Sequence, residues 1–137
     1  MAYALRMEDG ILMITFSGTL TNEDLSAGGD EVGKLEQSVS VVPHRIADLR
    51  PVRRVEIDFD GVYAFASSRR RLRFTNPFKT AIIVSDIVHF GFARMFQTLN
   101  DHPQISISIF GNDADAMSWL KMPGHAPPPT EWRPQRS

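Results

Sequence analysis

The sequence predicts an α/β fold, a single domain in which a mixed β-sheet is covered by helices and preceded by a β-hairpin. Runs rich in apolar and β-branched residues alternate along the chain with segments whose apolar residues recur at helical spacing. This alternation is typical of parallel strands joined by crossover helices. The first two apolar runs are separated only by a short turn. The 137 residues are enough for one core, because a chain of about 150 residues buries roughly 68–70% of its unfolded surface.

The hairpin is predicted at the start of the chain. Its strands are residues 3–7 and 11–16, and Glu8-Asp9-Gly10 forms the turn. Asp-Gly between two apolar runs is a strong hairpin signal, because a type I′ turn needs residues that accept a positive φ. A helix follows, with Thr21 as its N-cap and Asp24 as the reciprocal partner of a capping box.

The middle of the chain predicts one strand and a second helix. Residues 45–49 are an apolar run and are expected to be a strand, while residues 50–54 are polar and are expected to be a loop. Residues 55–59 are either a weaker extended segment or the approach to the next helix, whose expected N-cap is Asp60. The apolar positions of this helix are Val62, Phe65, Ala66 and Leu72.

The next two elements have the clearest patterns. Residues 78–84 are almost continuously apolar, as in a strand covered on both faces. Ser85 or Asp86 is expected to cap the following helix, which has a long amphipathic stripe. The stripe consists of Val88, Phe92, Met95, Phe96 and Leu99.

The last strand and helix complete the predicted domain at residue 121. Residues 105–110 alternate strictly between Ile and other residues, which predicts a strand. Residues 113–121 are expected to form a short helix that turns Ala116, Trp119 and Leu120 inward. Residues 122–137 are rich in Pro, which favours an extended, mobile tail.

Composition excludes several classes of protein. The chain has no Cys, so it has no disulfides, thiolate metal ligands or cysteine nucleophile. Lys and Arg number 15 against 16 Asp and Glu, a balance that argues against a broadly basic nucleic-acid binder. The longest uncharged stretch, Gly10 to Asn22, is shorter than the roughly 18 residues of a membrane span. With no signal-peptide pattern at Met1 either, we expect a cytoplasmic location.

A candidate contact surface lies on the helix after Asp86. At 100° per residue, Phe90 points away from the predicted apolar stripe, and Ile87 and Arg94 flank it. A large aromatic beside Ile and Arg on an outer face is typical of an interface, so the chain is expected to form a homodimer. The alternative is that a loop or the C-terminal tail covers Phe90.

A cluster of arginines is the second candidate site. Arg69, Arg70, Arg71 and Arg73 follow one another at the end of the second predicted helix. They are candidates for binding an anionic partner, a nucleotide or a lipid headgroup. The alternative is a solvated helix C-terminus, where cations complement the helix dipole.

The sequence offers no clear catalytic or metal site. The four His, at 44, 89, 102 and 125, have none of the spacings of paired metal ligands, and no serine lies in a nucleophile elbow. Asp58 and Asp60 are close enough in sequence to act as acid and base, although helix capping is the expected role of Asp60. We therefore expect a protein that is not an enzyme and has no cofactor or metal.

Several strings resemble the SpoIIAA-like group, which is related to STAS domains. RIADLR (residues 45–50) is similar to its central strand and FKTAIIV (78–84) to another of its strands. GFARMF (91–96) is similar to one of its helices, and AMSWL (116–120) to its closing segment. The resemblance spans roughly residues 3–120. It implies a superhelical α/β domain, also likened to lipid-binding Sec14-type folds, and no known enzymatic activity.

The resemblance leads to one functional expectation and one alternative. STAS proteins that antagonise anti-sigma factors carry a phosphorylatable Ser or Thr where this chain reads DFDGV at residues 58–62, without a hydroxyl. That phosphorylation switch therefore does not carry over. We expect a non-catalytic regulatory module that binds an unidentified protein. The alternative is a carrier or sensor of a small anionic ligand, a lipid or a nucleotide.

Overall fold

The computed structural model describes residues 2–124, 126–128 and 131–132. The strands are β1 (Tyr3–Glu8), β2 (Ile11–Phe16), β3 (Gly18–Thr21), β4 (Arg45–Asp48), β5 (Val52–Glu56), β6 (Phe78–Ile83) and β7 (Ile105–Phe110). The helices are α1 (Asn22–Ser38), α2 (Phe59–Arg70), α3 (Ile87–Leu99) and α4 (Asp113–Lys121). The predicted α/β class is confirmed.

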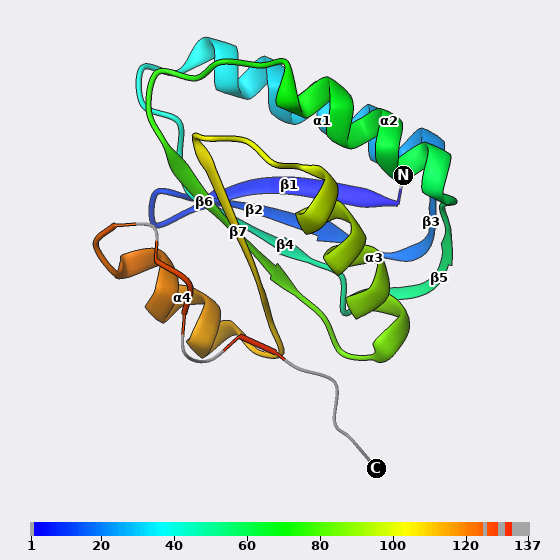
Figure 1. Cartoon of the computed structure of the whole chain (residues 1–137). Helices are drawn as coiled ribbons and strands as arrows, with labels where there is room; N and C mark the ends of the chain where they lie inside the picture. Colours follow the sequence, from blue (N-terminus) through cyan, green and yellow to red (C-terminus); the bar gives the residue numbers. More distant parts are fainter. Residues whose placement is uncertain (1, 125, 129–130, 133–137) are drawn as a thin grey trace.

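A five-stranded mixed sheet forms the centre of the molecule, in the order β1-β2-β4-β6-β7. β1 runs antiparallel to β2, and the other neighbours pair in parallel. Helices α1, α2 and α3 lie on one face of the sheet, and α4 lies on the other (Figure 1). All six residues of β6 are buried, because the strand is central and both faces are covered.

The local signals of the sequence are confirmed where they are strongest. The hairpin turn places Asp9 at φ 52° and Gly10 at φ 78°, the positive angles that the Asp-Gly pair predicts. Thr21 and Asp24 form the reciprocal capping box at the start of α1. Ala116, Trp119 and Leu120 face the sheet from α4, in one cluster with Ile46 and Phe110.

The expected loop at residues 50–54 is wrong, because most of it belongs to β5. This strand pairs in parallel with β3 as a separate two-stranded sheet. Val52 is buried, whereas Arg53 and Arg54 point to solvent. The strand is formed by pairing with residues 18–21, more than 30 positions away, so its own polar sequence does not show it.

Two helix details also differ from the sequence prediction. Asp58, not Asp60, caps α2, with its carboxylate accepting a 2.8 Å hydrogen bond from the Gly61 N–H. In α3 the buried side includes His89 and Ala93, and Val88 is 59% exposed. Phe92 and Phe96 of the predicted stripe pack on the core, so the inward face keeps part of that stripe and extends from it to His89 and Ala93.

Candidate functional site

Three charged residues meet in the interior, where α1, α2 and the sheet come together. Glu36 lies on the buried side of α1, three turns beyond Leu25. Arg45 is the first residue of β4, and Arg69 lies in the last turn of α2. Their side chains are 0%, 4% and 9% exposed. We call this group the Glu36 cluster.

Glu36 receives hydrogen bonds from both guanidinium groups. Arg69 donates from Nη1 to Oε1 and from Nη2 to Oε2, both at 2.7 Å. Arg45 donates from Nη1 to Oε2 at 2.6 Å. The pairing with Arg69 is bidentate, the geometry in which a guanidinium fork matches a carboxylate best.

The electrostatics of the Glu36 cluster are unbalanced. Burial would raise the pKa of Glu36, but the hydrogen bonds and charges of the two arginines outweigh it and hold that pKa below its ordinary value. Burial and the neighbouring charge of Arg69 lower the pKa of Arg45 to about 10, against the opposing effect of Glu36. One carboxylate is shared by two guanidiniums, so the cluster carries an excess of one positive charge.

Aromatic rings contact both guanidinium groups. The Arg45 guanidinium carbon lies 4.0 Å from the ring centroid of Phe78, and that of Arg69 lies 5.5 Å from Phe74. Each is a cation–π contact, which stabilises a desolvated cation without neutralising it.

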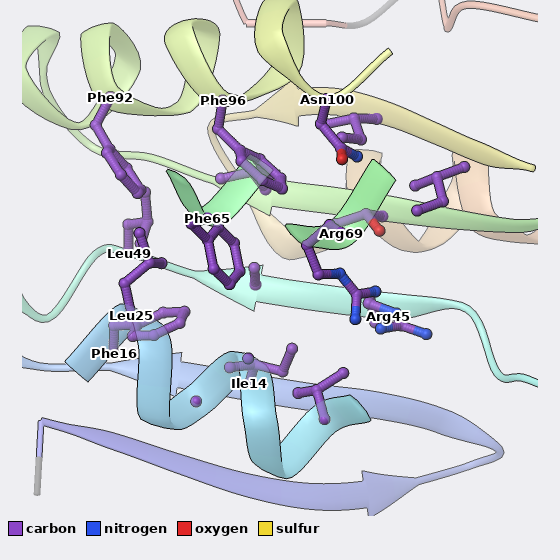
Figure 2. Close-up of a pocket in the computed structure, with 18 residues that line it drawn as sticks. Ile14, Phe16, Leu25, Arg45, Leu49, Phe65, Arg69, Phe92, Phe96 and Asn100 are labelled. Carbon is purple, nitrogen blue, oxygen red and sulfur yellow. The ribbon is translucent and has the colours of Figure 1, made fainter. Parts of the chain in front are cut away.

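An apolar cavity of about 90 Å³ lies beside the cluster, between the sheet and helices α1 to α3. Arg45, Arg69 and Asn100 line one end of it, and Phe16, Leu25, Leu49 and Phe92 gather at the other (Figure 2). Glu36 is not among the lining residues, so the charged side chains that face the cavity are both arginines. The cavity therefore has a cationic end and an apolar end.

Unsatisfied polar atoms lie at the cationic end. Within the described residues, neither Nδ2 nor Oδ1 of Asn100 has a hydrogen-bond partner, and neither does Nε of Arg45, although all three atoms are buried. Asn100 is the C-cap of α3, and its amide points toward Arg69 in Figure 2. Buried polar groups are almost always paired, so these orphans are unusual.

The four residues of the predicted arginine cluster differ in their burial. Arg69 is buried in the Glu36 cluster, whereas Arg70, Arg71 and Arg73 are exposed. Arg73 turns back and donates to the carbonyl oxygens of Arg70 and Leu72. A single site for an anion is thus not assembled from all four residues.

The predicted contact surface on α3 is also divided. Ile87 is 60% exposed, and Arg94 is exposed and donates to Gln97. Phe90 is half-buried, with its ring centroid 4.7 Å from that of Trp132. The C-terminal segment therefore covers Phe90, which was the alternative to an open interface.

Part of the expected tail contacts the domain. The backbone N–H of Trp132 donates to the backbone carbonyl of Ile109, and the Glu131 carboxylate accepts from the backbone N–H of Ile109. The indole of Trp119 donates to the carbonyl of Ala126. Residues 125, 129–130 and 133–137 of the tail lie outside the described residues.

Three of the histidines bind backbone groups. His44, His89 and His102 each accept a backbone N–H at Nδ1. His89 and His102 also place Nε2 at 2.8 and 2.7 Å from carbonyl oxygens, so Nε2 carries the proton. Nδ1 of His89 is 3.3 Å from the Ser85 hydroxyl and 3.3 Å from the Ser85 backbone N–H, so both groups of Ser85 face the same nitrogen. His125 lies outside the described residues.

The described part of the chain has neither a cluster of metal-binding side chains nor a membrane-spanning helix. No three or more His, Cys, Asp or Glu side chains lie close enough to hold a metal ion there. No helix in the same residues has the length and apolar character needed to cross a bilayer.

Sequence reasoning missed Glu36, Arg45 and Asn100. The helical spacing of Glu36 and Arg69 could have indicated that both are buried. Glu36 continues the inward stripe of α1 after Leu25, Gly28 and Val32. Arg69 continues the inward stripe of α2 after Val62 and Ala66. A charged residue at an inward position on each of two helices indicates a buried ion pair. No comparable signal marks Asn100.

Comparisons with known proteins show the fold. An uncharacterized protein of the DUF3478 family from Shewanella loihica, with a SpoIIAA-like fold, is 15% identical with a TM-score of 0.58, covering 87% of this chain and 92% of that one. An anti-sigma factor antagonist from Mycobacterium paratuberculosis is 14% identical with the same TM-score, covering 88% of this chain and 93% of that one. No family model and no curated protein matches. The chain thus has the SpoIIAA-like fold that its strings resemble.

Proposed function

We propose that this chain is a regulatory protein-interaction module of the cytoplasm that works without a catalytic step and forms a homodimer. One support is the fold, which it shares with a protein described as an anti-sigma factor antagonist. Fold alone does not fix function, so the proposal rests on the surface as well.

The observation that carries the proposal is a group of exposed apolar side chains in the first turns of two helices. Phe59 and Tyr63 on α2 are 55% and 49% exposed, and Ile87 and Val88 on α3 are 60% and 59% exposed. Phe59 and Tyr63 stack at 6.0 Å, so they present a continuous aromatic face to water. We call these four residues, one pair on each helix, the apolar surface.

The apolar surface has the composition of an interface. Aromatic and large aliphatic side chains are enriched at interface cores, and Arg is enriched with them. Arg94 lies seven residues, or about two turns, beyond Ile87 and therefore on the same side of α3. This revised surface retains Ile87 and Arg94 from the sequence prediction and omits Phe90, which Trp132 covers.

Sedimentation velocity of the purified chain tests the proposal. We expect a dimer for the parent and at least a tenfold weaker dimer for Ile87→Asp, because a charge would be buried at the contact. Val41→Asp is the matched control, since Val41 is 70% exposed and lies in the loop before β4. A parent that stays monomeric at all concentrations, or an Ile87→Asp variant that dimerises as the parent does, would contradict the homodimer.

A further inference from the structure

We propose that the cavity between the sheet and helices α1 to α3 binds a small monocarboxylate with a short aliphatic chain. Its carboxylate would lie against Arg45, Arg69 and the Asn100 amide, and its chain against Phe16, Leu25 and Leu49. This inference is independent of the proposed dimer, because the apolar surface and the cavity share no residue.

The charge of the Glu36 cluster favours a monoanion. Two buried guanidiniums share one carboxylate, and in the described part of the chain no second acid pairs with either of them. A buried charge without a counter-charge is costly. A ligand with one negative charge would bring the cluster to two cations and two anions, whereas a neutral ligand would leave the excess and a dianion would reverse it.

The unsatisfied donors favour a carboxylate. Nε of Arg45 and Nδ2 of Asn100 are N–H donors without a partner, and both residues line the cationic end of the cavity. A carboxylate has two oxygens that accept hydrogen bonds from both neutral and charged donors. The unsatisfied donors and the excess charge are separate observations, and both favour a carboxylate.

The size and the walls of the cavity limit the rest of the ligand. Its volume of about 90 Å³ is smaller than the roughly 150 Å³ of an engineered cavity that holds benzene. A chain of about four or five carbons fits such a space, whereas a nucleoside or a long acyl chain does not. The inference thus narrows the alternative of a lipid or nucleotide ligand to a short acid.

The groove between α1 and α2 adjoins the cavity. That groove and the cavity are both lined by Gly29, Phe65 and Arg69. The Phe65 ring lies so close to α1 that a Cβ at residue 29 would collide with it. The ring also packs on Phe96 of α3, at 5.4 Å between centroids. Rotation of Phe65 would therefore open the cavity toward the groove.

Nuclear magnetic resonance on the unmodified, ¹⁵N-labelled chain is the first test. Pentanoate is expected to shift the Asn100 side-chain amide and the Nε–H signals of Arg45 and Arg69. Pentan-1-ol and n-butylammonium match its length without its charge, so we expect both to bind at least tenfold more weakly. Decanoate should also bind more weakly, because its chain exceeds the cavity.

Three results would overturn the inference. One is the absence of these shifts with pentanoate at millimolar concentration. Another is binding of pentan-1-ol as tight as that of pentanoate or tighter, which would show that the ligand needs no negative charge. The same result with decanoate would show that the cavity does not limit the length of the chain. The third is shifts confined to Arg70, Arg71 and Arg73, which would move the anion to the exposed cluster.

The variant Asn100→Ala separates a binding role from a structural one. Because the amide has no partner in the described residues, its removal should leave the thermal stability unchanged or raise it. Pentanoate affinity should fall about tenfold, as the ligand loses a hydrogen bond to its charged group. Thr98→Ala is the matched control, because Thr98 is an exposed polar residue of the same helix that does not line the cavity, and this variant should bind pentanoate like the parent. A less stable Asn100→Ala chain with unchanged affinity would contradict the assignment.

Discussion

Glu36 and Arg69 join α1 to α2 through two parallel hydrogen bonds of 2.7 Å, both buried. Glu36 lies in the last turn of α1, where the helix dipole disfavours a carboxylate, and that turn has no basic residue of its own. Arg69 and Arg45 provide the positive charge from other elements. The pair thus holds the carboxylate in place and positions both arginines at the end of the cavity.

The Glu36 cluster should be important for stability. We expect Glu36→Gln to lower the free energy of unfolding by about 3–5 kcal/mol, because it leaves two buried guanidiniums without a counter-charge. Urea denaturation at neutral pH measures this loss. Glu31→Gln is the control, since Glu31 is exposed on the same helix and should change stability by less than about 0.5 kcal/mol. Similar losses for both variants would show that the buried pairing is not the cause.

The same carboxylate should make the fold sensitive to acid. The pKa of Glu36 is lower in the folded chain than its ordinary value of 4.5, so the unfolded chain takes up the proton first as the pH falls. Its contribution to stability is complete above pH 4.5 and is lost as the pH falls through the folded-state pKa.

Urea denaturation of the parent and Glu36→Gln at several pH values isolates this effect from those of the other carboxylates. The stability difference between the two chains should shrink from about pH 6 to about pH 3. A difference that stays constant over that range would contradict a lowered pKa at Glu36.

Much of the fold could be predicted because its signals are local. Three elements can each be identified from a few neighbouring residues. They are the Asp9-Gly10 turn, the Thr21 capping box and the alternating strand at residues 105–110. β5 could not be found this way, because residues 52–56 have an exposed, charged sequence and become a strand only by pairing with β3. On α3 the sequence prediction missed His89, because a polar residue there occupies a buried position and binds the carbonyl of Val52.

The candidate site was harder to predict because its partners are far apart in sequence. Arg69 looked like one member of an exposed basic run, and its partner Glu36 lies 33 residues earlier. Arg45 opens a strand whose other residues are apolar or paired elsewhere. Only the packing of α1 and α2 on the sheet brings these charges together, and only the end of α3 adds Asn100.

The two aspartates at the start of α2 offer a matched test of helix capping. Asp58→Ala should cost about 1 kcal/mol, because the Gly61 N–H loses the side chain that accepts its hydrogen bond. Asp60→Ala should cost less, since Asp60 lies in the first turn and stabilises α2 through the helix dipole. Thermal unfolding of the two variants shows which of them loses more stability. Equal losses, or a larger loss for Asp60→Ala, would contradict capping by Asp58.

Phe90 and Trp132 should stabilise the domain together. Phe90 also packs on the core cluster between the sheet and α3, so we expect Phe90→Ala to lower the free energy of unfolding by about 2–3 kcal/mol. In a double-mutant cycle with Trp132→Ala, the coupling between the two rings should be about 0.5–1.5 kcal/mol. Additive losses would show that the C-terminal segment does not pack on α3 in solution. In that case Phe90 would be exposed and would again be a candidate for the dimer contact beside Ile87.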